Sequence, residues 1–318
     1  MIRSTLSDNT IRWAIVGFLV LAAAGFLLPN WILNNTMFGL ARGLAVLGLL
    51  LLWRTGLVSF GHALYFGLGA YAVALLEKYT GATDLILRLG AALIVSSLVG
   101  FLLGFVLRHY RGIFFAMLSL AFSMVLYGIL IKSEALGSTD GFSVSQTTIL
   151  GWQPQTKYPL FLAIILICII AITGVQLYLR SALGHLTTSV RDNEIRVEYL
   201  GYSVAKAVHI KYVISAALAG VAGGVMAMAL GQVDPDSMVN WTVSGELVFI
   251  TIMSGPGSVV APFIGAITFE FLRTFAFELA PHAWQLIVGG TLLAIIFFLP
   301  EGLWSLVQRF WTKKGEVS

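Results

Sequence analysis

Long apolar stretches alternate with short polar connections along nearly the whole chain. An α-helix needs about 20 apolar residues to cross the ~30 Å hydrocarbon layer of a bilayer. Turn-forming residues such as Pro29-Asn30, Thr80-Gly81 and Gly255-Pro256-Gly257 separate the stretches. The pattern predicts an all-α polytopic membrane protein with about ten transmembrane helices, over residues 13–29, 36–53, 57–76, 85–107, 112–131, 159–179, 207–231, 240–254, 257–277 and 283–299.

The composition agrees with a membrane protein. Of 318 residues, 58% are hydrophobic and only 11% are charged, whereas soluble domains carry about 25% charged residues. This excludes a soluble enzyme and a disordered chain. Cys168 is the single cysteine, so no disulfide can form within the chain. Arg3 and Arg12 precede the first stretch as in a signal peptide, but nine further stretches follow, so we expect an uncleaved first span and one transmembrane domain over 1–318.

Basic residues predict the orientation, because they concentrate in short cytoplasmic loops. With a cytoplasmic N-terminus, 13 of the 19 Lys and Arg residues fall inside and four fall outside. The inner set is Arg3, Arg12, Arg54, Arg108, Arg111, Arg180, Arg191, Arg196, Lys206, Lys211, Arg309, Lys313 and Lys314, and the outer set is Lys78, Arg88, Lys132 and Lys157. Both termini are therefore predicted to be cytoplasmic.

The stretch 240–254 is the weakest span, because it is short and ends at Gly255-Pro256-Gly257. A re-entrant half-helix is the alternative there. Losing one crossing would place the basic C-terminal residues outside, so we expect ten spans with a broken helix near 254–257, where free backbone groups must be buried in protein or hydrated.

Small residues mark faces where helices approach closely in lipid. Gly100 and Gly104 have GxxxG spacing, as do Gly220 and Gly224, and Ala216 extends the second face by one turn. Spacing alone leaves two interpretations open, packing within this chain or contact with a second membrane subunit.

The polar stretch 180–206 is the longest between two spans on the cytoplasmic side. Its core, 191–200, has the mixed charge of a short helix that ends at Gly201. Ile195, Tyr199 and Leu200 form one apolar edge on this helix. A short amphipathic helix can dock in a groove of a soluble partner, and a solvated connector is the alternative.

Taken together, these stretches resemble the permease subunits of bacterial branched-chain amino acid ABC importers, of the LivM-like kind. The resemblance runs from about residue 36 to 305. It is carried by eight blocks in order: Ser59-Phe60-Gly61-His62-Ala63 with Phe66-Gly67-Leu68-Gly69-Ala70-Tyr71; Arg111-Gly112-Ile113-Phe114-Phe115-Ala116; Ser138-Thr139-Asp140-Gly141; Arg191-Asp192-Asn193-Glu194; Leu200-Gly201; Ser215-Ala216-Ala217-Leu218-Ala219-Gly220; Gly255-Pro256-Gly257-Ser258; and Pro300-x-Gly302-Leu303.

The resemblance implies that 180–206 is the coupling loop, which docks on a cytoplasmic ATPase. The coupling residues it implies are Arg191, Asp192, Asn193, Glu194, Glu198 and Gly201. It also implies four kinds of partner for this non-catalytic subunit of the inner membrane: a second related permease in a heterodimer, two cytoplasmic ATPases, an extracytoplasmic substrate-binding protein and the lipid bilayer. No cofactor is expected in the chain itself, because the ATPases bind ATP and Mg. Branched-chain amino acids are the implied substrate, with urea, short amides and other small amino or carboxylic acids as alternatives.

Charged residues inside spans cost several kcal/mol unless they are paired or hydrated. Counting along the spans places four of them in the outer half of the bilayer: Arg42, Glu246, Glu270 and Arg273. Glu270 and Arg273, three residues apart, are predicted to pair directly. One interpretation is that some of these residues line an outward-facing vestibule that accepts a zwitterionic amino acid. The alternative is that two of them form a structural ion pair and the others extend toward the outer membrane–water interface. His62 is either a substrate ligand or a packing histidine bonded to a neighbour.

Catalytic motifs are missing from the sequence. No Gly-x-x-x-x-Gly-Lys-Ser/Thr loop occurs, so this chain does not bind ATP in the P-loop manner, and the histidines lack zinc-ligand spacing. No catalytic pair points to an intramembrane enzyme. A stand-alone secondary carrier or channel would need coupling-ion carboxylates near the midplane and usually an internal repeat, and we find no convincing repeat.

Overall fold

The computed structural model describes residues 9–306, and α-helices dominate that part of the chain. Its long helices are α1 (Asn9–Gly25), α2 (Asn30–Arg54), α3 (His62–Thr80), α4 (Leu85–Leu107), α5 (Gly112–Lys132), α6 (Tyr158–Arg180), α9 (Val204–Leu230), α11 (Trp241–Ser254), α12 (Ala261–Leu279) and α13 (Trp284–Phe298). The shorter elements are η1 (Glu134–Leu136), β1 (Phe142–Ser143), α7 (Ala182–Asp192), α8 (Glu194–Tyr199), β2 (Gln232–Val233) and α10 (Pro235–Met238). The structure thus places one helix in each of the ten predicted stretches.

Five of these helices are long and apolar enough to cross a membrane: α2, α4, α5, α6 and α9. The other long helices are shorter or less apolar, so ten crossings remain a prediction. At about 1.5 Å per residue, the 14 residues of α11 extend roughly 21 Å, less than the hydrocarbon thickness.

Several helix ends differ from the predicted ones. α2 begins at Asn30 rather than at 36, because the extended Pro29 precedes it. α3 begins at His62 rather than at 57, and residues 57–61 form an irregular segment before it. α12 begins at Ala261, after the Gly255-Pro256-Gly257 break. The segment 57–61 contains the apolar residues Leu57, Val58 and Phe60. Hydropathy therefore cannot distinguish this irregular segment from the first turn of a helix.

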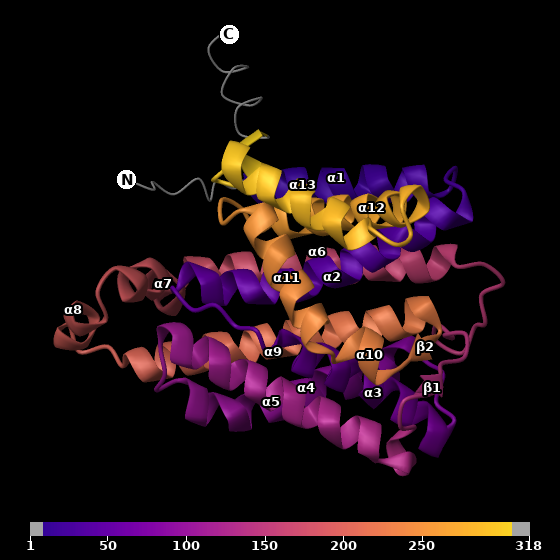
Figure 1. Ribbon diagram of the computed structural model, residues 1–318, viewed down its shortest axis with the longest axis horizontal. Coiled ribbons are helices and arrows are strands. Elements are labelled where there is room, and N and C mark those ends of the chain that lie inside the picture. Colours follow the sequence, from indigo (N-terminus) through magenta and orange to yellow (C-terminus); the bar gives the residue numbers. More distant parts are fainter. Residues whose placement is uncertain (1–8, 307–318) are drawn as a thin grey trace, which may run out of the picture.

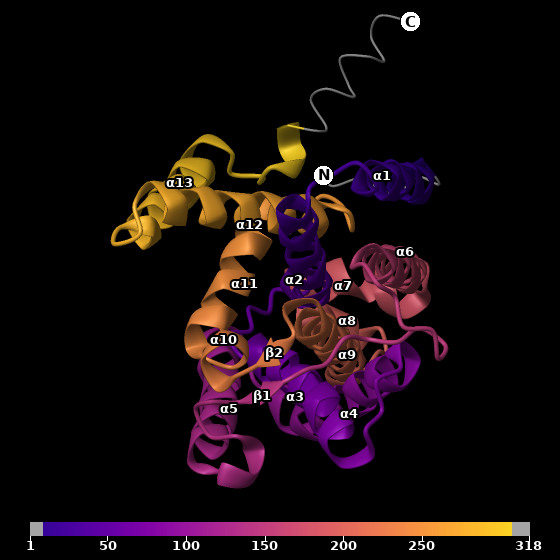
Figure 2. The same cartoon turned by 90° about the vertical axis from the view of Figure 1, so that its right-hand side faces the viewer.

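The helices form a bundle around α9. In Figure 1 most long helices run along the horizontal axis, with α7 and α8 at one end and β1 and β2 at the other. Figure 2 views the bundle along this axis, so that α1, α6 and α9 are seen nearly end-on while α11 and α12 lie across them. α9 packs against α2, α3 and α4, so it is the structural centre of the molecule.

Glycine faces allow α4 and α9 to approach closely. Gly100 of α4 lies against the side chain of Ala216 on α9, and Gly220 and Gly224 of α9 lie against Ser96 and Ala92 of α4. These glycine faces are therefore covered by the chain itself and do not remain open for a second subunit.

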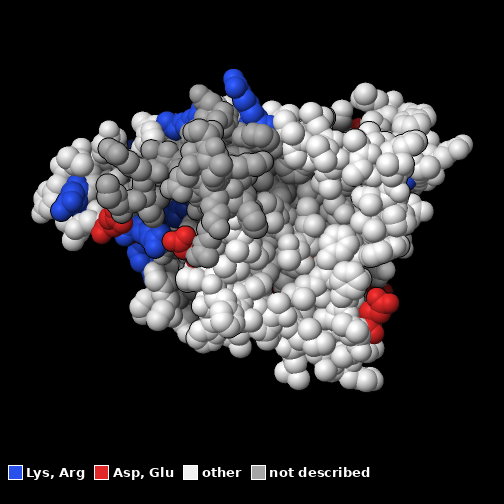
Figure 3. All heavy atoms as spheres, turned by 90° about the horizontal axis from the view of Figure 1, so that it is seen from above, with Lys and Arg blue, Asp and Glu red and all other residues white. Residues whose placement is uncertain are grey.

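The predicted inner and outer basic residues lie at opposite ends of the bundle. At the α7–α8 end, Arg54 donates hydrogen bonds to the Pro256 carbonyl at 2.6 and 3.0 Å, which holds the Gly-Pro-Gly break. At the β1–β2 end, Lys157 donates to Asn34 at 3.2 Å. The face in Figure 3 has Lys and Arg gathered toward the α7–α8 end and a largely uncharged middle. Arg3, Arg309, Lys313 and Lys314 lie outside the described residues, and the orientation remains a prediction.

Candidate functional site

The predicted coupling segment folds into two helices rather than one. α7 ends at Asp192, and the extended Asn193 separates it from α8. The Asn193 side-chain oxygen accepts a hydrogen bond from the Arg196 N–H at 3.0 Å, so Asn193 is the N-cap of α8. The single helical core predicted over 191–200 is therefore wrong. Glu194 occupies the first turn of α8, where a carboxylate favours the positive end of the helix dipole.

The predicted end of this helix is confirmed. α8 ends at Tyr199, and Gly201 follows it with a φ of +84°, in the left-handed region that favours glycine. The Gly201 N–H donates to the Glu198 carbonyl at 2.9 Å. This bond satisfies one of the free carbonyls at the helix end.

The apolar edge of α8 points into open space. Ile195, Tyr199 and Leu200 are 65%, 88% and 70% exposed. Val197 on the same helix is buried and fixes α8 to the rest of the chain. In Figure 1, α8 lies at the extreme end of the molecule. Three large apolar side chains are thus presented together, outside the bundle, on a segment otherwise rich in charge.

Two of the predicted coupling residues contact parts of this chain outside the segment 180–206. The Arg111 Nε lies 2.5 Å from a carboxylate oxygen of Glu194. The Arg191 side-chain stem packs beside Gly56, at the end of α2. Asp192, Asn193 and Glu198 have exposed side chains. The segment therefore has an inner side bound to the bundle and an outer side that is free.

The four charged residues predicted within spans form one cluster. Arg42 of α2 pairs with Glu246 of α11 and with Glu270 of α12, each at 2.9 Å. Arg273 lies 3.8 Å from Glu246. The spacing predicted that Glu270 pairs with Arg273 on its own helix. In the structure Glu270 pairs with Arg42 instead. Two arginines and two glutamates balance each other, which offsets the cost of placing charge in a bilayer.

Two members of the cluster lie at the middle of their helices. Arg42 is the middle residue of α2 and Glu270 the middle residue of α12. The predicted spans began six residues late for α2 and four residues early for α12, and the placement of the cluster in the outer half of the bilayer stays a prediction. The Arg42 and Glu270 side chains are buried, whereas the Arg273 side chain is 38% exposed and lies over the Trp284 ring at 5.5 Å. One side of the cluster is thus accessible.

His62 lies at the buried start of α3. Its Nε2 and the Ser215 hydroxyl are 2.7 Å apart. Other serines take up the neighbouring backbone groups. The Ala63 N–H donates to the Ser244 hydroxyl at 3.0 Å, and the Phe60 N–H donates to the Ser119 hydroxyl at 3.2 Å. Serines from α5, α9 and α11 thus satisfy a helix start that lies inside the protein, which explains how an irregular segment is tolerated there.

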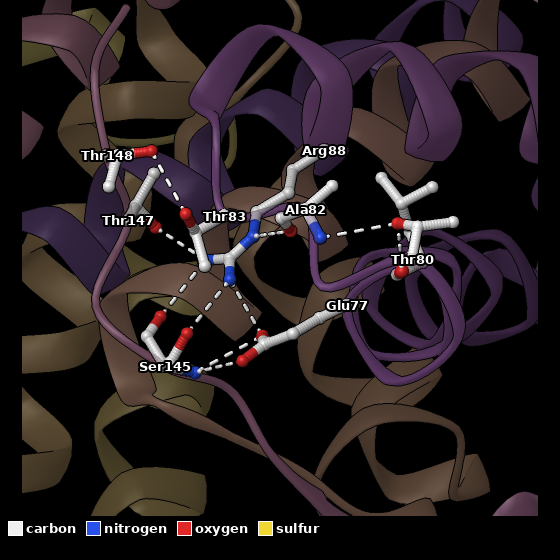
Figure 4. A network of polar contacts seen from close by, with 9 residues as sticks. Glu77, Thr80, Ala82, Thr83, Arg88, Ser145, Thr147 and Thr148 are labelled. Carbon is white, nitrogen blue, oxygen red and sulfur yellow. Dashed lines mark hydrogen bonds and ion pairs between the residues drawn. The ribbon is translucent and has the colours of Figure 1, made fainter. Parts of the chain in front are cut away.

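Arg88 is a residue whose role the sequence did not reveal. It was expected on the outer side, and the structure buries it completely in the first turn of α4. Its guanidinium donates to Glu77 at 2.7 Å, to Thr147 at 2.9 Å and to the Ser145 carbonyl at 3.0 Å. Figure 4 shows these contacts joining the end of α3, the start of α4 and segment 145–148. The sequence offered one hint of this ion pair, because Glu77 and Arg88 flank the Thr80-Gly81 turn. Their further partners, Ser145 and Thr147, come from a loop that is distant in sequence.

Strand pairing joins two loops at this end of the molecule. β1 and β2 are antiparallel, with Phe142 opposite Val233 and Ser143 opposite Gln232. The Val144 N–H also donates to the Gly231 carbonyl at 2.9 Å. Segments 133–157 and 231–239 therefore form one continuous surface, which Arg88 anchors to α3 and α4.

Comparison with known proteins gives consistent matches. Residues 31–297 match the profile of the family described as branched-chain amino acid transport system / permease component. The chain is 28% identical over 274 residues to the high-affinity branched-chain amino acid transport system permease protein LivM of Salmonella typhimurium, and 27% identical to LivM of Escherichia coli. Each match covers 78% of this chain and 64% of the relative, so the chain spans less than two thirds of the length of these relatives. No solved structure matches.

Proposed function

We propose that this chain, which belongs to the family of branched-chain amino acid transport permease components, is the membrane-spanning permease subunit of an ATP-driven importer. In this proposal the chain provides the substrate path across the inner membrane and does not hydrolyse ATP. Two partner ATPases bind ATP and Mg on the cytoplasmic side. A second related permease completes the path.

The exposed apolar edge of α8 is the observation that carries this proposal. The side chains of Ile195, Tyr199 and Leu200 are largely exposed, and α8 lies at one end of the bundle (Figure 1). Exposed apolar side chains grouped together mark a surface that another protein covers. A short helix whose one side is anchored and whose other side is apolar fits a groove in a soluble partner. We assign this side to the ATPase.

The opposite end fits the extracytoplasmic binding protein. Segments 133–157 and 231–239 form a single surface through the β1–β2 pairing, and Arg88 holds this surface on α3 and α4. A preformed surface binds with a smaller loss of conformational entropy than mobile loops do. Loaded binding protein docking there delivers substrate to the permease.

Branched-chain amino acids are the proposed substrate. The accessible side of the charge cluster, formed by Arg273 and Glu246, offers one positive and one negative group, as a zwitterionic amino acid requires. Urea, short amides and other small amino or carboxylic acids remain alternative substrates of the same importer type. A stand-alone secondary carrier is less well supported, because both glutamates of the cluster already face arginines and neither is left unpaired for a coupling ion.

Co-purification from native membranes tests this proposal. We expect the tagged chain to bring along a second permease and a P-loop ATPase. The double variant Tyr199→Asp/Leu200→Asp should reduce ATPase recovery at least tenfold, because carboxylates do not enter an apolar groove. Trp152→Asp is the control, since Trp152 is also a large apolar side chain, 59% exposed, and lies at the other end of the bundle. Equal ATPase recovery from both variants, or transport by the isolated chain, would contradict the proposal.

A further inference from the structure

Arg111 is held rigidly at the junction between α4 and α5. It is the residue immediately before α5, and its Nη1 donates to the backbone carbonyls of Arg108 at 2.6 Å and Tyr110 at 2.8 Å. Its Nε contacts Glu194 at 2.5 Å. Contacts on both sides of the guanidinium fix its position, so Glu194 meets a preorganised partner rather than a freely moving side chain.

This ion pair connects the coupling segment to α5. The two side chains are 30% and 36% exposed, and partly exposed ion pairs contribute little to stability. The pair is therefore a weak source of folding energy. What it supplies is a defined link between α8, which projects from the bundle, and a helix within the bundle.

α5 in turn contacts the buried start of α3. Ser119 lies eight residues after Arg111, about 12 Å along a stiff helix. Its hydroxyl accepts the Phe60 N–H at 3.2 Å, and its backbone lies against Gly61. Gly61 leads directly into His62, which is bonded to Ser215 of α9. A displacement of α5 along its axis would therefore act directly on the irregular segment 57–61.

We propose that Arg111 is a positioning residue that passes movement of the coupling segment, through Glu194, to α5 and then to the buried start of α3. This inference rests on the proposed function and adds a second cytoplasmic element to the coupling segment, the α4–α5 connection. Glu194 then acts by binding Arg111 of its own chain, while the apolar edge of α8 contacts the ATPase. The two functions of α8 lie on two different sides of one helix.

Charge exchange in the reconstituted importer, with its ATPases and binding protein present, tests the inference. Arg111→Glu and Glu194→Arg each place like charges together, so each should lower binding-protein-stimulated ATP hydrolysis about fivefold or more, with unchanged ATPase recovery. The double variant restores an ion pair of opposite polarity and should recover at least half of the wild-type stimulation. Arg108→Glu is the matched control, because this neighbouring side chain lies over the Phe105 ring at 4.9 Å, and it should keep stimulation within twofold.

An alanine cycle gives an independent measurement that does not depend on reversing charges. If the two residues act as one link, Arg111→Ala/Glu194→Ala should lose no more stimulation than the stronger single variant. Losses that multiply in the double variant, together with no recovery on charge exchange, would overturn the inference. A wild-type preparation without any ATPase would instead overturn the proposed function, so the two failures are distinguishable.

Discussion

Buried arginines show how single residues organise this protein. Arg42 faces two carboxylates, whereas Arg88 faces one carboxylate and several neutral oxygens. In both places the charge is compensated, as a buried ion requires. The sequence indicated that the intramembrane charges needed partners, but it could not identify them, because the partners come from three helices or from a distant loop.

Loss of Arg88 should loosen the outer surface. Arg88→Ala leaves Glu77 without its cation and frees segment 145–148, so we expect a loss of about 3 kcal/mol in the free energy of unfolding. Hydrogen exchange should rise over 142–150 while α6 stays protected. Lys78→Ala is the control, because Lys78 makes an exposed contact with the Ala135 carbonyl. Unchanged exchange in Arg88→Ala would contradict the anchoring role.

The charge cluster should respond unequally to substitution. Arg42→Met leaves two glutamates facing each other, so the amount of folded protein in membranes should fall severalfold. Arg273→Gln removes a half-exposed side chain 3.8 Å from Glu246, so folding should change little. If Arg273 lines the substrate path, this variant raises the KM for uptake with little change in the maximal rate. Quantitative blotting and uptake kinetics separate the two effects, and equal folding losses would contradict the geometry.

The helices are the elements that the sequence predicted best. Their existence follows from hydropathy, and most ends lie within a few residues of the prediction. The misses have local physical causes. The start of α3 is obscured by apolar residues that are not helical, and the break between α7 and α8 depends on one asparagine that caps a helix. Each strand of the two-stranded sheet is only two residues long, which is too short to leave a periodic signal.

The contact between α3 and α9 should be intolerant of any side chain at Gly69. A β-carbon at Gly69 would overlap the Gly220 backbone carbonyl of α9, and backbone cannot rotate away. We expect Gly69→Ala to lower the melting temperature in detergent by several degrees. Gly90→Ala is the control, since a β-carbon there meets nothing within 4 Å, and alanine favours a helix by up to about 1 kcal/mol. Equal melting temperatures for the two variants would contradict this packing.

At the scale of the whole molecule, the two ends differ in charge and in chemistry. One end carries α7, α8 and most of the basic residues on the face shown in Figure 3. The other carries the paired loops. This asymmetry predicts that α8 faces the cytoplasm and the β1–β2 surface faces outward.

Single cysteines test this orientation in whole cells. Cys168 is fully buried, so Cys168→Ala provides a background without reactive thiols. A membrane-impermeant maleimide should label Gln155→Cys from outside, and should label His109→Cys only after the cells are permeabilised, because both positions are exposed. The reverse pattern would contradict the predicted topology.

We propose that partner ATPases drive transport by this permease. Uptake of radiolabelled leucine tests this in proteoliposomes that contain the purified chain, either alone or with the co-purified second permease, ATPases and binding protein. We expect concentrative uptake only for the complete assembly and only with ATP and Mg. Uptake by the chain alone, with or without an ion gradient, would contradict it.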